Sequence, residues 1–232
     1  MEGIFYGVGV GSEDSELLTI KAVKTIQNAD VIIAPKTEKQ KESIAFSIAK
    51  QYIPKRAKII FQIFPMTKNK KLLNEAWLCN KNEIVKYLKR GKKVVFLTLG
   101  DPMIFSTYIN IFVLLKDEGF HIKTIPGIPS FCAIAARLGV PLVKENEILS
   151  IIPATAENNT LQKVLKNSEN IVLMKVSKNS DEILNQLRRS GHIKNAILVS
   201  RSGLNDEIIH DNLETNKFFN INYLSTIIAK KK

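Results

Sequence analysis

The sequence predicts an α/β protein with two α/β domains, the first built on a mainly parallel sheet and the second on a mixed sheet. Apolar β-branched runs alternate with segments of helical spacing over residues 4–125, which is typical of parallel strands joined by helices. Two prolines and a glycine then interrupt the pattern at 126–129. Beyond them, short runs lie too close together for crossover helices, which indicates antiparallel neighbours. We therefore expect domains at 1–126 and 127–232.

The first strand is expected at 4–10. It leads through a glycine loop into LLTIKAVKTIQ, whose apolar residues recur at helical spacing, with Asp14 or Ser15 as a natural N-cap. The run VVFLTL at 94–99 is apolar on both faces, so it should lie centrally, with helices covering both sides of the sheet. The other predicted elements of this domain are strands at 31–34, 59–64 and 121–125 and helices at 38–51, 71–90 and 106–118.

The second domain should begin with a helix directly after the proline-rich interruption. The short runs EIIHDNL and NYLSTIIA leave no room for crossover helices, so this sheet should end in a hairpin-like arrangement. Its predicted elements are helices at 130–138 and 181–189 and strands at 148–152, 171–176, 196–200 and 223–229.

Composition points to a cytoplasmic protein. Hydrophobic residues make up 45% of the 232 residues, and no apolar run approaches the roughly 18 residues of a membrane span. The start, MEGIFYGVGV, predicts a first strand and not a signal peptide. Cys79 and Cys132 lack the spacing of a metal or redox site, and the histidines are isolated, so we expect no metal site and a reducing compartment.

The net charge of +12 comes from one segment. Residues 36–93 hold 16 Lys or Arg against four acids, and the rest of the chain is balanced. A solvated surface, an acidic small molecule and a nucleic acid can each explain this excess. Because the basic residues are scattered over several predicted elements without an aromatic stacking platform, nucleic acid is the least favoured of the three.

Two stretches carry the chemistry that the residues alone suggest. In LGDPMIFSTY, Asp101 lies between Gly100 and Pro102 at the carboxyl end of a predicted strand, where it can meet a ligand or simply cap the loop. GVGVG looks like half of a dinucleotide fingerprint, but the third glycine is missing and no acid closes the second strand, which argues against a Rossmann cofactor site. The glycines still predict a tight turn or a close approach to the backbone.

Three stretches together resemble the tetrapyrrole methylases, the corrin and sirohaem group of S-adenosylmethionine-dependent methyltransferases. They are GVGVGSEDSELLTIKA, LGDPMIFSTY and PGIPSFCAIAARLGVPL, in the family's order and spanning nearly the whole chain. With ADVIIAPK, the last two are most similar to the enzymes that methylate carbon 20 of precorrin-2 or cobalt-factor II in cobalamin biosynthesis. Two departures stand out. Ser12 and Glu13 replace the family's Pro-Gly, and Pro35 replaces the acid of the uroporphyrinogen methylases.

The resemblance implies a homodimer of two-domain subunits, with S-adenosylmethionine folded into the cleft between the domains, an acidic tetrapyrrole as substrate, and neither nucleic acid nor membrane as partner. It names no catalytic residue. For Met174, core packing is the alternative. The function alternatives are a methylase of the same fold acting on another tetrapyrrole position, ribosomal RNA or diphthine, or a basic nucleic-acid-binding module. The implied cofactor-binding residues are Gly100, Asp101, Met103, Ile104, Pro129, Ser130, Met174 and Gly203, and the implied substrate-binding residues are Gly11, Ser12, Lys36 and Tyr108.

Overall fold

A computed structural model describes residues 3–12, 14–37, 42–67, 69–176, 180–214 and 221–231. The chain divides into two compact units, Met1–Pro129 and Ser130–Lys232. No helix among the described residues combines the length and the apolar character that crossing a bilayer requires.

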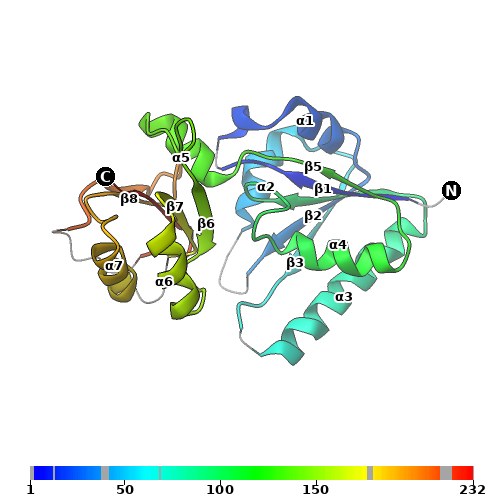
Figure 1. The fold of residues 1–232 in the computed structure, drawn as a ribbon. Helices are drawn as coiled ribbons and strands as arrows, with labels where there is room; N and C mark the ends of the chain where they lie inside the picture. The colour runs from blue at the N-terminus through cyan, green and yellow to red at the C-terminus, as the bar shows by residue number, and fades with distance from the viewer. Residues whose placement is uncertain are drawn as a thin grey trace. The chain divides into compact units, whose positions relative to one another are not determined.

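The sheet of the first unit is entirely parallel, with strand order β3-β2-β4-β1-β5 (Figure 1). Strand β4 is central and buried from Val94 to Thr98, as its two-sided apolar sequence predicts. The parallel fold expected for this half is therefore confirmed. The strands are β1 Ile4–Gly9, β2 Val31–Lys36, β3 Lys58–Ile63, β4 Lys93–Thr98 and β5 Ile122–Ile125.

Helices cover both faces of this sheet. Val8 of β1 packs in one core cluster with Ile26 and Ile48, whereas Phe5 packs in another with Leu88 and Leu115. Because successive strand residues point to opposite faces, α1 and α2 lie on one side and α3 and α4 on the other (Figure 1). The elements are α1 Ile20–Gln27, α2 Ile44–Ala49, α3 Lys70–Leu88 and α4 Tyr108–Asp117, with short 3-10 turns η1 Ser15–Leu17 and η2 Lys50–Tyr52.

The first two helices differ from their predictions. Helix α1 begins at Ile20, and its N-cap is Thr19, whose hydroxyl accepts the Ala22 N–H at 3.1 Å. Asp14 instead caps η1 by accepting the Glu16 N–H at 2.8 Å, so the predicted cap was wrong. Helix α2 is shorter than the helix predicted at 38–51. Residues 38–41 of that prediction lie outside the described residues, as does Glu13 of the glycine loop.

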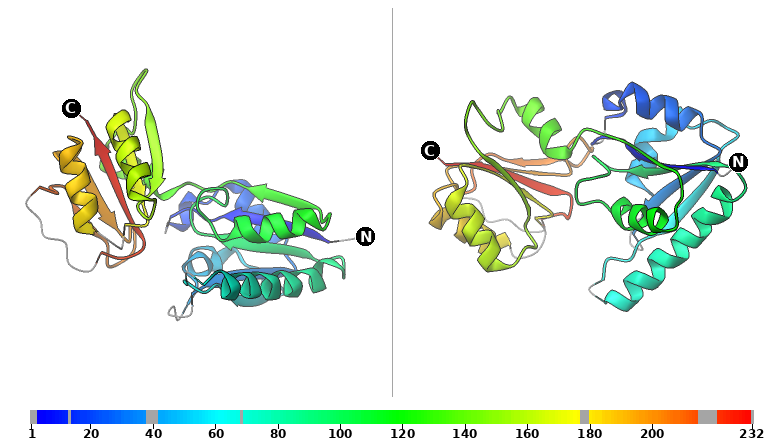
Figure 2. Two further views of the ribbon diagram at one scale, coloured as in Figure 1. Left: turned by 60° about the horizontal axis from the view of Figure 1, so that its bottom comes forward. Right: turned by 45° about the vertical axis from the view of Figure 1, so that its right-hand side comes forward.

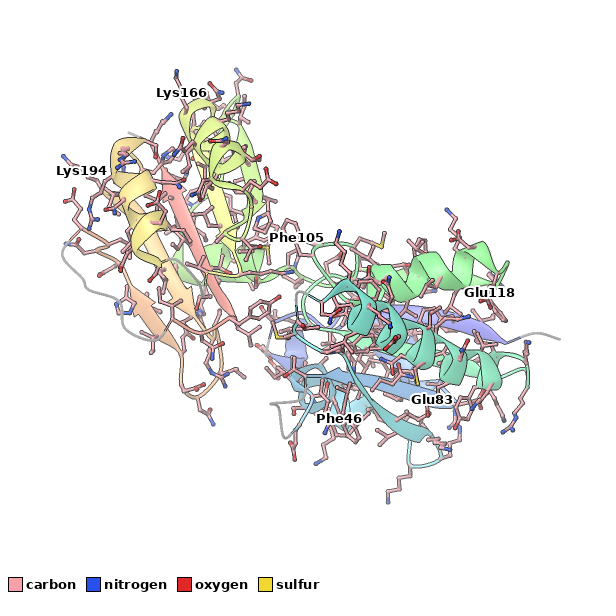
Figure 3. All side chains as sticks on the ribbon, turned by 90° about the horizontal axis from the view of Figure 1, so that it is seen from below. Phe46, Glu83, Phe105, Glu118, Lys166 and Lys194 are labelled. Atoms are coloured by element: carbon pink, nitrogen blue, oxygen red, sulfur yellow. The ribbon has the colours of Figure 1, made fainter. Side chains whose placement is uncertain are left out.

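Polar side chains fasten α3 to the edge strand and to α4. Gln62 of β3 donates to the Glu83 carboxylate at 2.9 Å and to the Asn80 carbonyl at 3.0 Å. The buried Lys81 pairs with Glu118 at the end of α4; Figure 3 labels Glu83 and Glu118 on these helices. These contacts fix α3 against strand β3 and against the end of α4.

The second unit has a mixed sheet, as predicted, with strand order β6-β7-β10-β8-β9. Strands β6 and β7 are parallel, and the other pairs are antiparallel. Helices α6 and α7 pack on one face, and α5 lies on the other (Figure 2, right). The elements are α5 Ser130–Leu138, β6 Leu149–Pro153, α6 Asn158–Asn167, β7 Asn170–Met174, α7 Ser180–Arg189, β8 Asn195–Ser200, β9 Ile208–His210 and β10 Ser225–Lys230.

Helix α6 was not among the elements predicted from the sequence. Its sequence, NNTLQKVLKN, is rich in asparagine, which has a low helix propensity. Two leucines four residues apart, Leu161 and Leu165, nevertheless bury themselves in the core of this unit, and tertiary packing decides the conformation.

His192 is buried in the second unit, and both of its ring nitrogens have hydrogen-bond partners. The side chain is fully buried, with Nε2 3.1 Å from the Ser168 carbonyl oxygen and Nδ1 2.8 Å from the Ser190 hydroxyl. Because a carbonyl only accepts, Nε2 carries the proton of the neutral ring. Burial lowers the pKa of His192, and the hydrogen bond to Ser168 offsets only part of that effect.

We therefore expect the free energy of unfolding to be highest above the pKa of an unfolded histidine, about 6.5. It should decline as the pH falls through that value toward the lower folded pKa, because the unfolded chain then binds the extra proton. Urea unfolding of the wild type and of His192→Gln between about pH 5 and 8 checks this. Equal slopes of stability against pH for the two proteins would contradict it.

Candidate functional site

Glycines from three strands meet at the carboxyl edge of the first sheet. Gly11 and Gly100 exchange backbone hydrogen bonds of 2.8 and 3.3 Å. A Cβ on Gly9 would lie 2.5 Å from the nitrogen of Gly127, and one on Gly127 would lie 2.2 Å from the oxygen of Gly100. The glycines predict a close approach to the backbone. At Gly9, the group that approaches is the backbone of Gly127.

Asp101 holds two loops of this edge together. Its Oδ1 accepts the Met103 N–H at 2.8 Å, and its Oδ2 accepts the Gly127 N–H at 3.0 Å. The first bond caps the loop after β4, and the second ties that loop to the one after β5. Each carboxylate oxygen has a further lone pair, so a ligand contact stays compatible with both bonds.

The rest of the loop after β4 presents apolar side chains to the outside. Met103 is 51% exposed, and the exposed Phe105 has a φ of 48°, which is unusual for a bulky residue (Figure 3). The Ser106 hydroxyl donates to the Pro102 carbonyl, and the Ile104 N–H donates to the Asp101 carbonyl at 3.4 Å. Local hydrogen bonds thus fix the turn. They hold Phe105 in its strained backbone conformation, which persists only where the surrounding structure enforces it.

Two buried hydroxyls at this edge have no hydrogen-bond partner within the described part of the chain. They belong to Ser12, which follows the Gly11 turn, and Thr98, which ends β4; both residues are less than a tenth exposed. A buried hydroxyl without a partner is costly, so a polar ligand at this edge would relieve the cost. Sequence analysis did not select Thr98, although it is the one polar residue in the run VVFLTL.

The other two predicted substrate residues of this unit differ in their surroundings. Lys36 ends β2 and is half-buried, with Nζ 5.9 Å from the centre of the Phe61 ring. Tyr108 is fully buried: its hydroxyl lies 2.7 Å from Thr124 Oγ1, and burial raises its pKa. A Cβ on Gly7 would lie 2.1 Å from the Tyr108 ring. The Tyr108 side chain is therefore part of the core of the first unit.

The second unit brings Met174 and Gly203 to one edge of its sheet. Met174 ends β7, and Gly203 follows β8, on either side of β10. The start of β10 joins them, because the Leu224 carbonyl accepts the Arg201 N–H at 2.9 Å and Ser225 accepts the Val176 N–H at 3.3 Å. Gly203 is exposed, with a φ of 73°, and Met174 is half-buried. Ser130 begins helix α5, directly after Pro129.

The basic segment 36–93 does not form one surface. Lys36 and the start of α3 lie at the carboxyl edge of the first sheet, but Lys58 and Lys93 begin their strands at the opposite edge, where both backbone N–H groups bond to Asp30. The basic residues therefore lie at both ends of the parallel strands, in keeping with their scatter over several predicted elements. Other basic residues near this opposite edge are Arg56, Lys89, Arg90 and Lys92, while Lys39, Lys41 and Lys68 lie outside the described residues.

The sequence profile described as "Tetrapyrrole (Corrin/Porphyrin) Methylases" matches residues 5–216 of this chain. The chain belongs to this family. The match spans the strands of the first sheet and strands β6 to β9 of the second, so the family resemblance and the two-unit α/β fold agree.

Three curated relatives of this tetrapyrrole methylase carry names from cobalamin biosynthesis. A "Probable cobalt-precorrin-2 C(20)-methyltransferase" of Methanocaldococcus jannaschii is 40% identical over 64% of this chain, which spans 63% of that relative. The "Cobalt-precorrin-2 C(20)-methyltransferase" of Salmonella typhimurium is 30% identical over 100% of this chain and 98% of its own length. A "Precorrin-2 C(20)-methyltransferase" of a Sinorhizobium species is 28% identical over 86% of this chain and 84% of its own length.

Solved structures share the fold of this tetrapyrrole methylase. A cobalt precorrin-4 methyltransferase superimposes with a TM-score of 0.74 at 22% identity, covering 98% of this chain and 94% of its own. A uroporphyrin-III C-methyltransferase from Thermus thermophilus, complexed with S-adenosylhomocysteine, gives 0.72 at 19% identity, covering 98% and 92%. The predicted fold class is confirmed.

Proposed function

We propose that this tetrapyrrole methylase transfers a methyl group from S-adenosylmethionine to carbon 20 of precorrin-2 or its cobalt form, in cobalamin biosynthesis. The observation that carries the proposal is the similarity over the full length of the chain to the Salmonella typhimurium relative of that name. The Methanocaldococcus jannaschii relative supports the same substrate position.

The residues at the carboxyl edge of the first sheet fit a polar cofactor. The unpartnered hydroxyls of Ser12 and Thr98 offer hydrogen bonds, and Asp101 retains lone pairs beyond its two backbone bonds. When bound, S-adenosylmethionine would supply an activated methyl group on a sulfonium. The residues that we propose to hold it are Gly100, Asp101, Met103 and Ile104 in the first unit, Pro129 and Ser130 where the units join in sequence, and Met174 and Gly203 in the second unit.

The chain's own contribution is positioning. Backbone packing among Gly9, Gly100 and Gly127 and the two bonds of Asp101 fix the position of the loop after β4. A preorganised loop lowers the cost of aligning donor and acceptor carbon, the main requirement of an in-line methyl transfer. The proposed substrate contacts are Gly11, Ser12 and Lys36. We infer that the protein works as a cytoplasmic homodimer and without nucleic acid.

A single-turnover assay with mass spectrometry tests the proposal. We expect one methyl group to be added to the tetrapyrrole, and faster turnover of the cobalt form, because the relatives of 40% and 30% identity carry the cobalt name. Equal or reversed rates on the two forms would contradict the metal preference alone. Absence of methylation of both forms, with methylation of ribosomal RNA or a salt-sensitive RNA complex, would overturn the proposed function.

A further inference from the structure

Glu207 links helix α5 to the loop that carries Gly203. Its Oε2 accepts from the Arg137 guanidinium at 2.6 Å and from the Gly203 N–H at 2.7 Å. Its Oε1 accepts a second Arg137 hydrogen bond, and the same guanidinium donates to Ser202 Oγ at 3.3 Å. Arg137 lies in the last turn of α5, 70 residues before Glu207 in the sequence.

These contacts favour the ionised form of the Glu207 carboxyl. Burial would raise the pKa of its carboxyl, but the hydrogen bonds from Arg137 and from the Gly203 N–H outweigh burial, and the pKa is lowered. The Glu207 side chain is only 17% exposed, so solvent screens it less than an ordinary surface pair. The two hydrogen bonds between the Arg137 guanidinium and the Glu207 carboxylate also fix the relative orientation of the two side chains, which a single hydrogen bond does not.

The loop between β8 and β9 is bent sharply where Glu207 reaches it. Arg201 and Gly203 both have left-handed backbone conformations, with φ of 52° and 73°. Two backbone bonds follow, from the Leu204 N–H to the Arg201 carbonyl at 3.0 Å and from the Glu207 N–H to the Leu204 carbonyl at 2.9 Å. A left-handed arginine is strained, so further contacts are needed to hold this shape. The Glu207 carboxylate supplies one directly at Gly203.

We propose that Arg137 and Glu207 are positioning residues for cofactor binding. This inference rests on the proposed function, in which Ser130 and Gly203 contact S-adenosylmethionine. Helix α5 begins at Ser130, and the Arg137–Glu207 pair fixes this helix against the Gly203 loop within the second unit. Because the Gly203 N–H donates to Glu207, this N–H is not available to the cofactor.

Glu207→Gln tests the inference, because glutamine keeps an acceptor for Gly203 but loses the charge that pairs with Arg137. Its matched control is Asp206→Asn, which removes the neighbouring carboxylate that pairs with Arg201 and makes no bond to Gly203. Calorimetric titration with S-adenosylmethionine should show about tenfold weaker binding for Glu207→Gln and near wild-type binding for the control. The KM for the cofactor should rise likewise, with kcat changed less.

Hydrogen exchange of residues 201–207 should become faster in Glu207→Gln. Should that variant fold poorly, Arg137→Lys keeps the positive charge but loses the fork, and it should show the same weakening to a smaller degree. Faster exchange with unchanged affinity would overturn the inference. A wild-type protein that does not bind S-adenosylmethionine at all would instead overturn the proposed function, and this inference with it.

Discussion

Replacing Gly127 by alanine is expected to destabilise the first unit by about 3 kcal/mol or more. The added Cβ would lie 2.2 Å from the Gly100 oxygen and 2.8 Å from the Gly9 carbonyl carbon. Real Cβ atoms do not come this close, and the atoms they meet are backbone, so no flexible side chain can turn aside. The junction of β1, β4 and β5 must open instead, and the hydrogen bonds between Gly11 and Gly100 would be distorted with it.

Gly119→Ala provides the matched control in the same unit. Gly119 has a φ of 81°, but beyond its two chain neighbours no atom of the described residues lies within 4 Å of the position of its Cβ, so alanine adds backbone strain without a collision. Strain of this kind costs about 1–2 kcal/mol. Urea unfolding of both variants separates the two effects. A loss for Gly127→Ala no larger than that for Gly119→Ala would show that the junction is not as closely packed as its geometry indicates.

Much of the fold could be predicted, because the spacing of apolar residues and the length of each apolar run indicate whether a segment forms a strand or a helix. The run VVFLTL needs apolar cover on both sides, and that requirement alone places β4 in the middle of a parallel sheet. The start of α1 could not be predicted in the same way. Asp14 and Thr19 are both good caps, and only the 3-10 turn between them, closed by tertiary contacts, decides which one begins the helix.

The strand-end position of Gly100 and Asp101 could be predicted from the sequence, but the interactions of these residues could not. Motif spacing brings Gly100 and Asp101 to a strand end, where ligands of α/β proteins bind. Sequence cannot show that the partner of Asp101 is the Gly127 N–H, because that contact depends on the neighbouring positions of β1, β4 and β5. The pairing of Arg137 with Glu207 spans 70 residues, and no local pattern marks it.

Asp101→Asn is expected to lower the free energy of unfolding by about 1.5–3 kcal/mol and to weaken S-adenosylmethionine binding about ten- to a hundredfold. Asparagine offers one oxygen where aspartate offers two. Either the Met103 N–H or the Gly127 N–H then faces an amide NH2 group and loses its acceptor. The protein should still fold, since the glycine packing beside this residue is unaltered. Thermal unfolding and calorimetric titration measure the two effects separately.

Asp14→Asn is the control for this substitution, because Asp14 makes one local bond, to the Glu16 N–H of an exposed turn. Asparagine caps such a turn nearly as well as aspartate, so the control should lose well under 1 kcal/mol. If Asp101→Asn lost no more than the control, the bond to Gly127 would contribute nothing to the junction. If stability fell as expected but affinity did not, Asp101 would be a structural link between two loops and not a cofactor ligand.

The backbone packing of Gly127 and the carboxylate of Asp101 act on the same strand ends. We therefore expect the losses of unfolding free energy in Gly127→Ala and Asp101→Asn to be non-additive in the double variant.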